Sequence, residues 1–405
     1  MYISLKNTGV ILSLSVLVFF SYSAMAKEKS QTWLDIQINK DPEVVKAKAL
    51  LQATNHQAKS LTLAVYNPDF EASYEKEGDF DNFSIGLRQT IDVWDKQSVN
   101  KTIGEMGLYE RKQQLLSLLE SKKANAISTL INWYSAKESA HIAIEREKQL
   151  QTLLDIVEEK RSAGILGPLD AELVYLNLSQ VLNEIAQYQI GLKSAEVKIQ
   201  ELLPDWVAGQ PYMIPRNLGI STYSINTEWI EKHPDVQVAK AQWNAQQAHA
   251  KLSSIEYKTS PTVGISAGQN GEENTLGLTF SMPLNIRNNY SDSIKAAYSE
   301  VNAAEANFRA IYRKKTFEAK ANYESVVTIK KYYKQWQKLI SGRVENSAKL
   351  LKRRWEAGDM NTSDYMLALN QRSEGLQAGI QLEKQFKLAE IEFLLSIGQI
   401  SKLEL

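Results

Sequence analysis

Hydrophobic and polar residues alternate along four short segments of the chain. Phe70 to Tyr74 and Phe83 to Val93 form the first pair of alternating rows, and Val263 to Ala267 and Leu276 to Met282 form the second. Alternation with period two over about 8–10 residues predicts β-strands. The expected strands cover about 68–76, 82–93, 261–268 and 275–283. Acidic, glycine-containing loops at 75–82 and 268–274 pair them into hairpins.

The rest of the chain predicts very long helices. Neither glycine nor proline occurs between Gly107 and Gly164, and no proline follows Pro283. A heptad seam runs through Leu178, Val181, Ile185, Tyr188, Leu192, Ala195, Ile199 and Leu202. A helix over 96–162 would be about 100 Å long, so such helices must run beside one another as antiparallel coiled coils. The turns of these α-hairpins are expected at 163–169 and 357–363.

The chain contains the same unit twice. Asp41-Pro42-Glu43-Val44 matches His233-Pro234-Asp235-Val236, and Ala163-Gly164 matches Ala357-Gly358 further along. Each copy is predicted to hold a helix (about 42–64 and 234–257), a β-hairpin and a long α-hairpin (about 96–203 and 288–400). The expected division is a first repeat at 27–203, a linker at 204–227 and a second repeat at 228–405.

The N-terminal segment has the three parts of a secretory signal peptide. Lys6 precedes an apolar run from Val10 to Phe20, and Ala24-Met25-Ala26 forms a small-residue cleavage site. Residues 1–26 are therefore predicted to be a cleavable signal peptide of an exported protein. The alternative is an uncleaved anchor, although the run is shorter than the roughly 20 residues of a membrane span.

The composition excludes several kinds of site. The 405 residues include no cysteine, which excludes disulfides, thiolate metal sites and lipid attachment through an N-terminal cysteine. The 47 basic and 47 acidic residues balance, which gives no reason to expect nucleic-acid binding. The four histidines form no ligand pair on a helix, and no hydrolase elbow or phosphate loop occurs. We therefore expect no enzyme, cofactor or metal site.

The apolar rows of the strands must face either a protein core or lipid. Export, strand length and the attachment of each hairpin to long helices favour lipid. Because a barrel in lipid must close, and the smallest bacterial barrels have eight strands, four strands require more than one chain. The residues expected to face lipid are Phe70, Tyr74, Phe83, Ile85, Leu87, Val263, Ile265, Leu276, Leu278 and Phe280.

The ordered set of motifs resembles the TolC-like outer-membrane efflux channels. The marks are the proline-led helix starts, Pro68 and Pro261 ahead of the strands, and the turns from Gly164 to Asp170 and from Gly358 to Asp364. The resemblance implies a mainly α-helical homotrimer with a twelve-stranded membrane β-barrel continuous with a coiled-coil α-helical barrel. It implies a protein in the outer membrane of a Gram-negative bacterium, with a periplasmic extension and the linker as a belt. The lack of cysteine predicts that this protein is not lipidated.

The resemblance also implies a passive exit channel of a tripartite efflux system. The partners would be outer-membrane lipid, a periplasmic adaptor protein and an inner-membrane pump, with the RND type favoured. The first turn and the short chain look most like the heavy-metal branch, so metal ions are one possible cargo. Drug efflux and type I protein secretion are alternatives, and so is a soluble periplasmic coiled-coil adaptor.

The turn ends of the α-hairpins carry the candidate functional residues. Asp170 and Asp364 match family positions near the periplasmic constriction, where threefold carboxylate rings would favour cations. Equally, each could only stabilise the start of the returning helix. The sequence departs from the best-known gate pattern, with Trp355 in place of tyrosine, Met360 in place of arginine and Leu367 in place of aspartate. A more apolar closure is therefore possible, with Arg353 and Arg354 nearby.

Overall fold

Two compact units make up the part of the chain that the computed structural model describes, residues 33–165, 167–208, 227–340 and 344–403. The strand unit comprises 42–118 and 227–316, and the hairpin unit comprises the described residues of 1–41, 119–226 and 317–405. Each unit contains segments from both sequence copies, so the compact units do not coincide with the two predicted repeats. The predicted signal peptide and most of the predicted linker lie outside the described residues.

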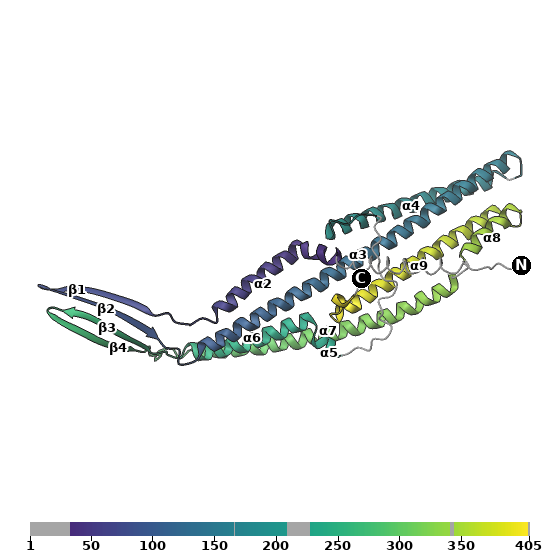
Figure 1. The fold of residues 1–405 in the computed structure, drawn as a ribbon. Helices are drawn as coiled ribbons and strands as arrows, with labels where there is room; N and C mark the ends of the chain where they lie inside the picture. Colours follow the sequence, from purple (N-terminus) through teal and green to yellow (C-terminus); the bar gives the residue numbers. More distant parts are fainter. Residues whose placement is uncertain (1–32, 166, 209–226, 341–343, 404–405) are drawn as a thin grey trace, which may run out of the picture. The chain divides into compact units, whose positions relative to one another are not determined.

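A four-stranded antiparallel sheet forms one end of the strand unit (Figure 1). Its strands lie in the order β1 (Asp69–Glu77), β2 (Phe80–Thr90), β3 (Thr262–Asn270) and β4 (Glu273–Ser281). The central pairing of β2 with β3 joins the two sequence copies, from Phe83 opposite Gln269 to Thr90 opposite Thr262. Among the described residues, β1 and β4 pair on one side only, so the sheet has two free edges.

The hairpin loops are shorter than the sequence predicts. The expected loops at 75–82 and 268–274 are wrong, because the strands continue until only two residues separate them, 78–79 and 271–272. Gly78 and Gly271 both have a φ of +62°, which glycine adopts without strain at the first position of a tight hairpin turn. Acidic residues such as Glu75 and Glu273 therefore belong to paired strands.

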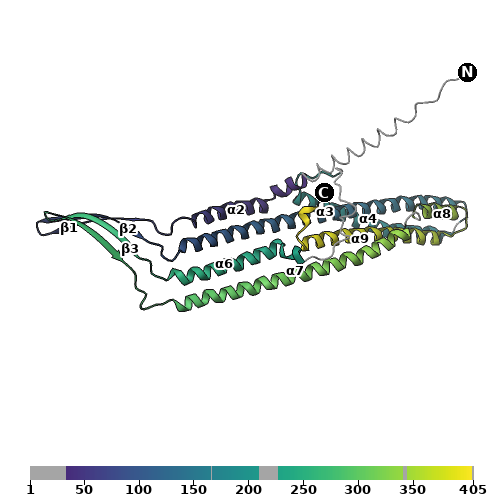
Figure 2. The same ribbon diagram turned by 60° about the horizontal axis from the view of Figure 1, so that its bottom comes forward.

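Four helices continue the strand unit in the same order as the strands. They are α2 (Pro42–Ser60), the first part of α3 (Lys96–Ser162), α6 (Pro234–Glu256) and the first part of α7 (Ser291–Ile340), and a short α5 (Thr227–Glu231) precedes α6. Figures 1 and 2 both show these helices side by side. Adjacent helices touch through the pairs Gly104–Ala58, Tyr109–Gln237 and Trp243–Phe308.

The second proline-led helix start is held by a partly buried carboxylate. The His233 imidazole accepts a hydrogen bond from the backbone N–H of Asp235, which caps α6. The Asp235 carboxylate accepts hydrogen bonds from Ser117 (2.5 Å) and Lys315 (2.9 Å). Burial alone would raise the pKa of Asp235, but these two partners together lower it below its usual value. The helix start is thus tied to both α3 and α7.

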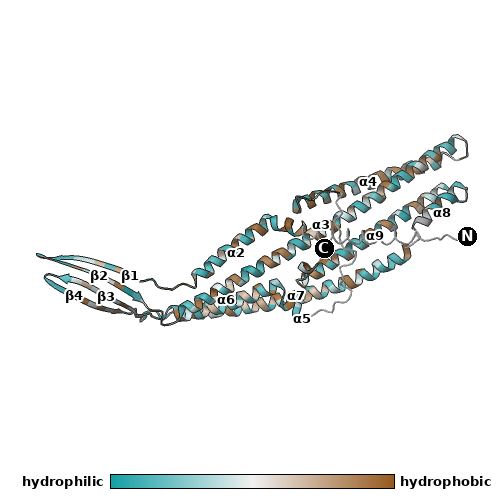
Figure 3. Ribbon diagram, viewed as in Figure 1, coloured by the Kyte–Doolittle hydropathy of each residue, from teal (hydrophilic) through white to brown (hydrophobic). Residues whose placement is uncertain are grey.

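The hairpin unit contains two helical hairpins. The rest of α3 returns as α4 (Pro168–Leu202), and the rest of α7 is followed by α8 (Val344–Glu356) and α9 (Thr362–Ser396). A short helical segment at 33–40 and the 3₁₀ helix η2 (Ile400–Lys402) also belong to it. Apolar and polar positions are interspersed along these helices (Figure 3), as expected for coiled-coil packing.

The described start of the predicted linker packs against the hairpin unit. The ring of Trp206 is buried edge-on against that of Trp133, with 5.2 Å between centroids. The Asp205 carboxylate accepts hydrogen bonds from Lys40 (2.8 Å) and Gln37 (2.6 Å). Residues 204–206 therefore belong structurally to the end of the first hairpin.

A glycine notch fixes how α7 meets α9. Trp336 of α7 lies against Gly379 so closely that a Cβ there would overlap the indole ring. The indole N–H donates to the carbonyl oxygen of Gly375, one turn away, at 3.0 Å. The pair of glycines thus gives the indole both space and a hydrogen-bond acceptor.

Replacing Gly379 with alanine is expected to destabilise the protein by about 1–3 kcal/mol, because the added methyl overpacks the Trp336 site. Gly375→Ala is the matched control. No atom lies within 4 Å of a Cβ at position 375, and alanine favours a helix interior over glycine by about 0.5–1 kcal/mol. Thermal unfolding followed by circular dichroism should rank Gly379→Ala below the wild type and Gly375→Ala at or above it. Equal stability of the two variants would contradict the close fit of the Trp336 indole against Gly379.

Candidate functional site

The sheet separates its apolar and polar residues onto two faces. The register places all ten residues predicted to face lipid on one face, with Phe70 opposite Leu87, Leu87 opposite Ile265 and Ile265 opposite Leu278. Every one of these side chains is exposed, and Leu276 (86%) and Leu278 (84%) are exposed most. In the described chain nothing covers this apolar face. Contact between such an apolar area and water is unfavourable, so we expect another molecule to cover the face.

The opposite face of the sheet is polar and crowded. It holds serines, threonines and the glycines Gly86, Gly264, Gly268 and Gly277. A Cβ at Gly264 would meet both Thr279 and Arg88, so only glycine fits. Arg88 forms an ion pair across the strands with Glu71. The sheet is therefore closely packed on its polar side and open on its apolar side.

Both α-hairpins turn by the same backbone motif. Gly164 (φ +72°) and Gly358 (φ +78°) are left-handed, and each follows the end of a helix. Ile165 N–H donates to the carbonyl of Lys160, and Asp359 N–H donates to that of Arg354, both at 2.9 Å. These are the 6→1 bonds of Schellman helix ends. The matching alanine–glycine pairs of the two copies therefore reflect a shared turn geometry.

The two candidate aspartates occupy equivalent places after these turns. Asp170 and Asp364 are each the third residue of the returning helix, where a carboxylate interacts favourably with the helix dipole. The N-cap of α9 is Asn361, whose side chain accepts from the Asp364 N–H at 2.7 Å and donates to the Asp364 carboxylate at 2.9 Å. The N-cap of α4 is Gly167, which makes no side-chain cap. Asp170 is half-buried and Asp364 is exposed.

The remaining tip candidates differ in their surroundings. Trp355 is only 4% exposed and stacks on Tyr365 with 5.1 Å between ring centroids. The ammonium of Lys160 lies 4.8 Å from the Trp355 ring centroid. Met360 is partly buried against the same cluster, whereas Arg354 is exposed. Trp355 thus acts as a packing residue within one chain.

One apolar cluster joins the two hairpins near their turns. Its buried members from the first hairpin are Leu150, Leu153, Val157, Ala171, Val174 and Val181, and those from the second are Trp355, Tyr365, Met366 and Leu369. We call this set the tip core. Burial of the large side chains in such a cluster stabilises by about 1.5–3 kcal/mol each. The tip core therefore holds the two hairpins together through buried apolar area.

A buried arginine adds a polar link that the sequence analysis missed. Arg146 of α3 donates to Glu184 of α4 at 2.5 Å and to Asn370 of α9 at 2.7 Å. Arg146 precedes Leu150 by one helical turn, so it lies on the seam of Leu150, Leu153 and Val157. A charge within an apolar seam is the signal that could have identified it, because such a charge needs partners.

The described residues contain no group of three or more His, Asp or Glu side chains placed to hold a metal ion. None of the helices described here is both long enough and apolar enough to be a candidate membrane span.

The fold has clear counterparts among solved structures. No family model and no curated protein sequence matches the chain. The structure of CusC, described in terms of folding and transmembrane channel formation, superposes with a TM-score of 0.76 at 14% identity, covering 91% of this chain and 92% of CusC. The Campylobacter jejuni CmeC outer membrane channel gives a TM-score of 0.76 at 15% identity, covering 92% and 86%.

The Neisseria gonorrhoeae MtrE outer membrane channel, in its open state, gives a TM-score of 0.74 at 13% identity over 91% of this chain and 88% of MtrE. These neighbours are channels rather than enzymes. The mainly helical architecture with a small antiparallel sheet, predicted from periodicity, is confirmed, and so is the resemblance to TolC-like channels. The chain has the fold of the TolC-like outer-membrane channels.

Proposed function

We propose that three copies of this chain form an exit channel in the outer membrane of a Gram-negative bacterium. The observation that carries the proposal is the sheet. No described residue covers its apolar face, and its edge strands β1 and β4 each lack one neighbour within the described chain. Unpaired strand edges cannot stand in hydrocarbon. Three sheets joined edge to edge give twelve strands, which satisfies both edges of every sheet and turns every apolar face to lipid.

The polar face of the sheet suits the inside of such a barrel. Its close packing around Gly264 and its serine, threonine and ion-paired side chains are compatible with water. The long hairpins α3–α4 and α7–α9 would form the periplasmic part of the conduit. The channel is passive, since the mature chain offers no phosphate-binding loop that could supply energy.

The similarity to CusC, CmeC and MtrE supports a role in efflux with a periplasmic adaptor and an inner-membrane pump. We favour an RND-type pump, with metal ions as a possible cargo. Drug efflux and type I secretion remain alternatives within the same architecture. A soluble periplasmic adaptor is the alternative outside it, and it would require a protein partner over the apolar face.

Leu278→Arg is expected to block insertion into the outer membrane. An arginine near the bilayer midplane on the lipid face costs about 2–4 kcal/mol. Thr275→Arg is the matched control, because Thr275 lies on the polar face of the same strand. Membrane fractionation and native electrophoresis should find trimer for Thr275→Arg but not for Leu278→Arg. Recovery of the wild-type protein in the soluble periplasmic fraction would contradict the proposal that the chain forms a membrane channel.

Asp170→Ala combined with Asp364→Ala tests the constriction. If the carboxylates ring the pore, the double variant should lose cation selectivity and cation block in planar bilayers. If they only stabilise the starts of α4 and α9, currents stay unchanged and stability falls by about 0.3–1 kcal/mol per residue. Asp292→Ala, which removes a 96% exposed carboxylate near the start of α7, is the control.

A further inference from the structure

One aromatic side chain breaks the separation of apolar and polar residues on the sheet. Phe80, the first residue of β2, lies opposite Glu77 of β1, so both side chains belong to the polar face. The other residues that the register places on this face are serine, threonine, asparagine, glycine or charged. Phe80 is nevertheless 56% exposed. Lipid contact does not account for this ring, because the polar face turns away from lipid in the proposed barrel.

The Phe80 ring lies against the turn of the second hairpin. A Cβ at Gly271 would come within 3.1 Å of the ring, which is closer than an ordinary van der Waals contact. The backbone N–H of the same glycine donates to the Asn82 side chain at 2.8 Å. The ring and this hydrogen bond hold the two hairpin turns together, at the end of the sheet that is farthest from the helices of the strand unit (Figure 1).

A cavity of about 470 Å³ opens beside this ring. Glu77 and Phe80 line it from the first hairpin, and Asn270, Gly271 and Glu272 line it from the second. We call these five residues the turn pocket. Its volume lies within the range of small-molecule sites, about 300–1,000 Å³. Its walls offer a ligand one aromatic ring, one amide and two carboxylates.

The carboxylates of the turn pocket lack a neutralising partner. The segments 75–81 and 271–274 together contain six acidic residues and one basic residue, Lys76. Because side chains alternate along a strand, Lys76 lies on the other face of the sheet from Glu77. In the described chain neither Glu77 nor Glu272 forms an ion pair, and both are exposed. The turn end of the polar face therefore has a negative potential.

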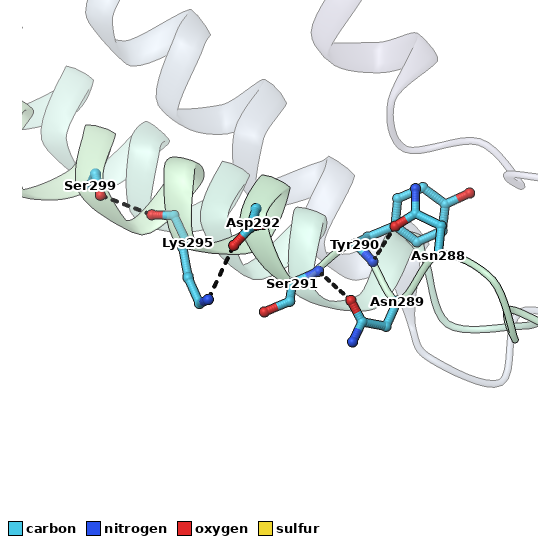
Figure 4. Close-up of polar contacts among 7 residues, drawn as sticks. All are labelled: Asn288, Asn289, Tyr290, Ser291, Asp292, Lys295 and Ser299. Carbon is cyan, nitrogen blue, oxygen red and sulfur yellow. Dashed lines mark hydrogen bonds and ion pairs between the residues drawn. The ribbon is translucent and has the colours of Figure 1, made fainter.

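Acidic side chains elsewhere in the strand unit do have basic partners. Figure 4 shows Asp292, at the start of α7, in an ion pair with Lys295 at 3.1 Å. Within the sheet, Glu71 is paired with Arg88. Uncompensated negative charge is therefore a particular property of the turn end, where the exposed ring of Phe80 also lies.

A ring and two carboxylates together favour an organic cation. The face of an aromatic ring attracts a cation that lies within about 6 Å of its centroid, and quaternary ammonium groups are recognised in this way. Apolar substituents on the cation would cover the exposed ring, and the carboxylates would balance its charge. A bare Ca²⁺ ion fits less well, because it takes 6–8 oxygen ligands and gains nothing from the ring.

We propose that the turn pocket binds organic ammonium ions that carry apolar groups. This inference rests on the proposed channel function and narrows its cargo. With the polar face lining the barrel, three turn pockets would surround the outer mouth, farthest from the helices. An open pocket with one ring binds weakly, which suits a conduit because a bound ion must also leave. The cargo would meet these pockets at the last step of its exit.

Binding is tested on the purified full-length mature protein in detergent at low ionic strength. Benzyltrimethylammonium is the probe, and saturation-transfer NMR titrations give its affinity. Phe80→Leu should weaken binding about two- to fivefold, whereas Phe80→Tyr keeps an aromatic face and should bind like the wild type. Equal affinities of the leucine and tyrosine variants, or no binding by the wild type, would overturn the inference.

The charges are tested with a double variant. Glu77→Gln combined with Glu272→Gln should weaken binding at least fivefold, since one unit charge about 4 Å away changes an affinity by about that factor even in water. Asp69→Asn is the matched control, because Asp69 lies on the same face of β1, about 26 Å along the strand from Glu77. Equal losses in the control and the double variant would show that binding does not occur at the turn pocket.

Conductance in planar bilayers separates this inference from the proposed function. The probe should reduce the potassium current of the wild type, and Phe80→Leu should relieve the block. If the protein binds the probe but conducts no current, the channel proposal is wrong and the turn pocket stands. If the protein conducts but Phe80→Leu changes neither the binding nor the block, the turn pocket inference is wrong and the channel stands.

Discussion

The structure depends on one constraint. A four-stranded sheet with an apolar face cannot by itself pair its outer strand edges or cover its apolar side chains. Antiparallel pairing completes the hydrogen bonds of β2 and β3, but in the part of the chain that the structure describes it leaves the outer edges of β1 and β4 without strand partners. The same sheet presents Leu276, Leu278 and Phe280 to its surroundings. Both deficits disappear when copies of the sheet join edge to edge in lipid. In the proposed channel, assembly and membrane insertion are therefore a single requirement.

The sequence duplication explains how one chain builds a continuous wall. Because β2 of the first copy pairs with β3 of the second, the sheet order follows the chain order. The helices attached to these strands, α2, α3, α6 and α7, lie in the same order within the strand unit. Each strand therefore continues into its own helix without a crossover. The hydrogen bonds of Trp94 and Lys96 and the stack of Tyr257 on Tyr290 fix this passage from strand to helix, since these contacts involve all four connections.

Sequence patterns predicted the long helices well, because no other pattern in those segments suggested a different structure. α3 has the expected bounds, Lys96–Ser162, and the run without glycine or proline after Gly107 makes up most of it. Strand ends were predicted less well, because alternation reports which face a side chain occupies and not where backbone pairing stops. At 91–93 and 282–286 the alternation continues while the ladder ends. At the hairpins, polar residues such as Glu75 suggested a loop although they pair across the ladder.

The packing between the two hairpins near their turns could not be predicted from the sequence alone. The Schellman turns at Gly164 and Gly358 follow from the alanine–glycine repeats, but the packing of Trp355 on Tyr365 and the bridge from Arg146 to Asn370 join residues far apart in the chain. The packing of Trp355 on Tyr365 stabilises through buried apolar area, and this stabilisation depends little on salt. A polar lock would weaken with ionic strength. A tip held by the tip core should therefore respond to a force or a partner that separates the hairpins, more than to the ionic strength of the solution.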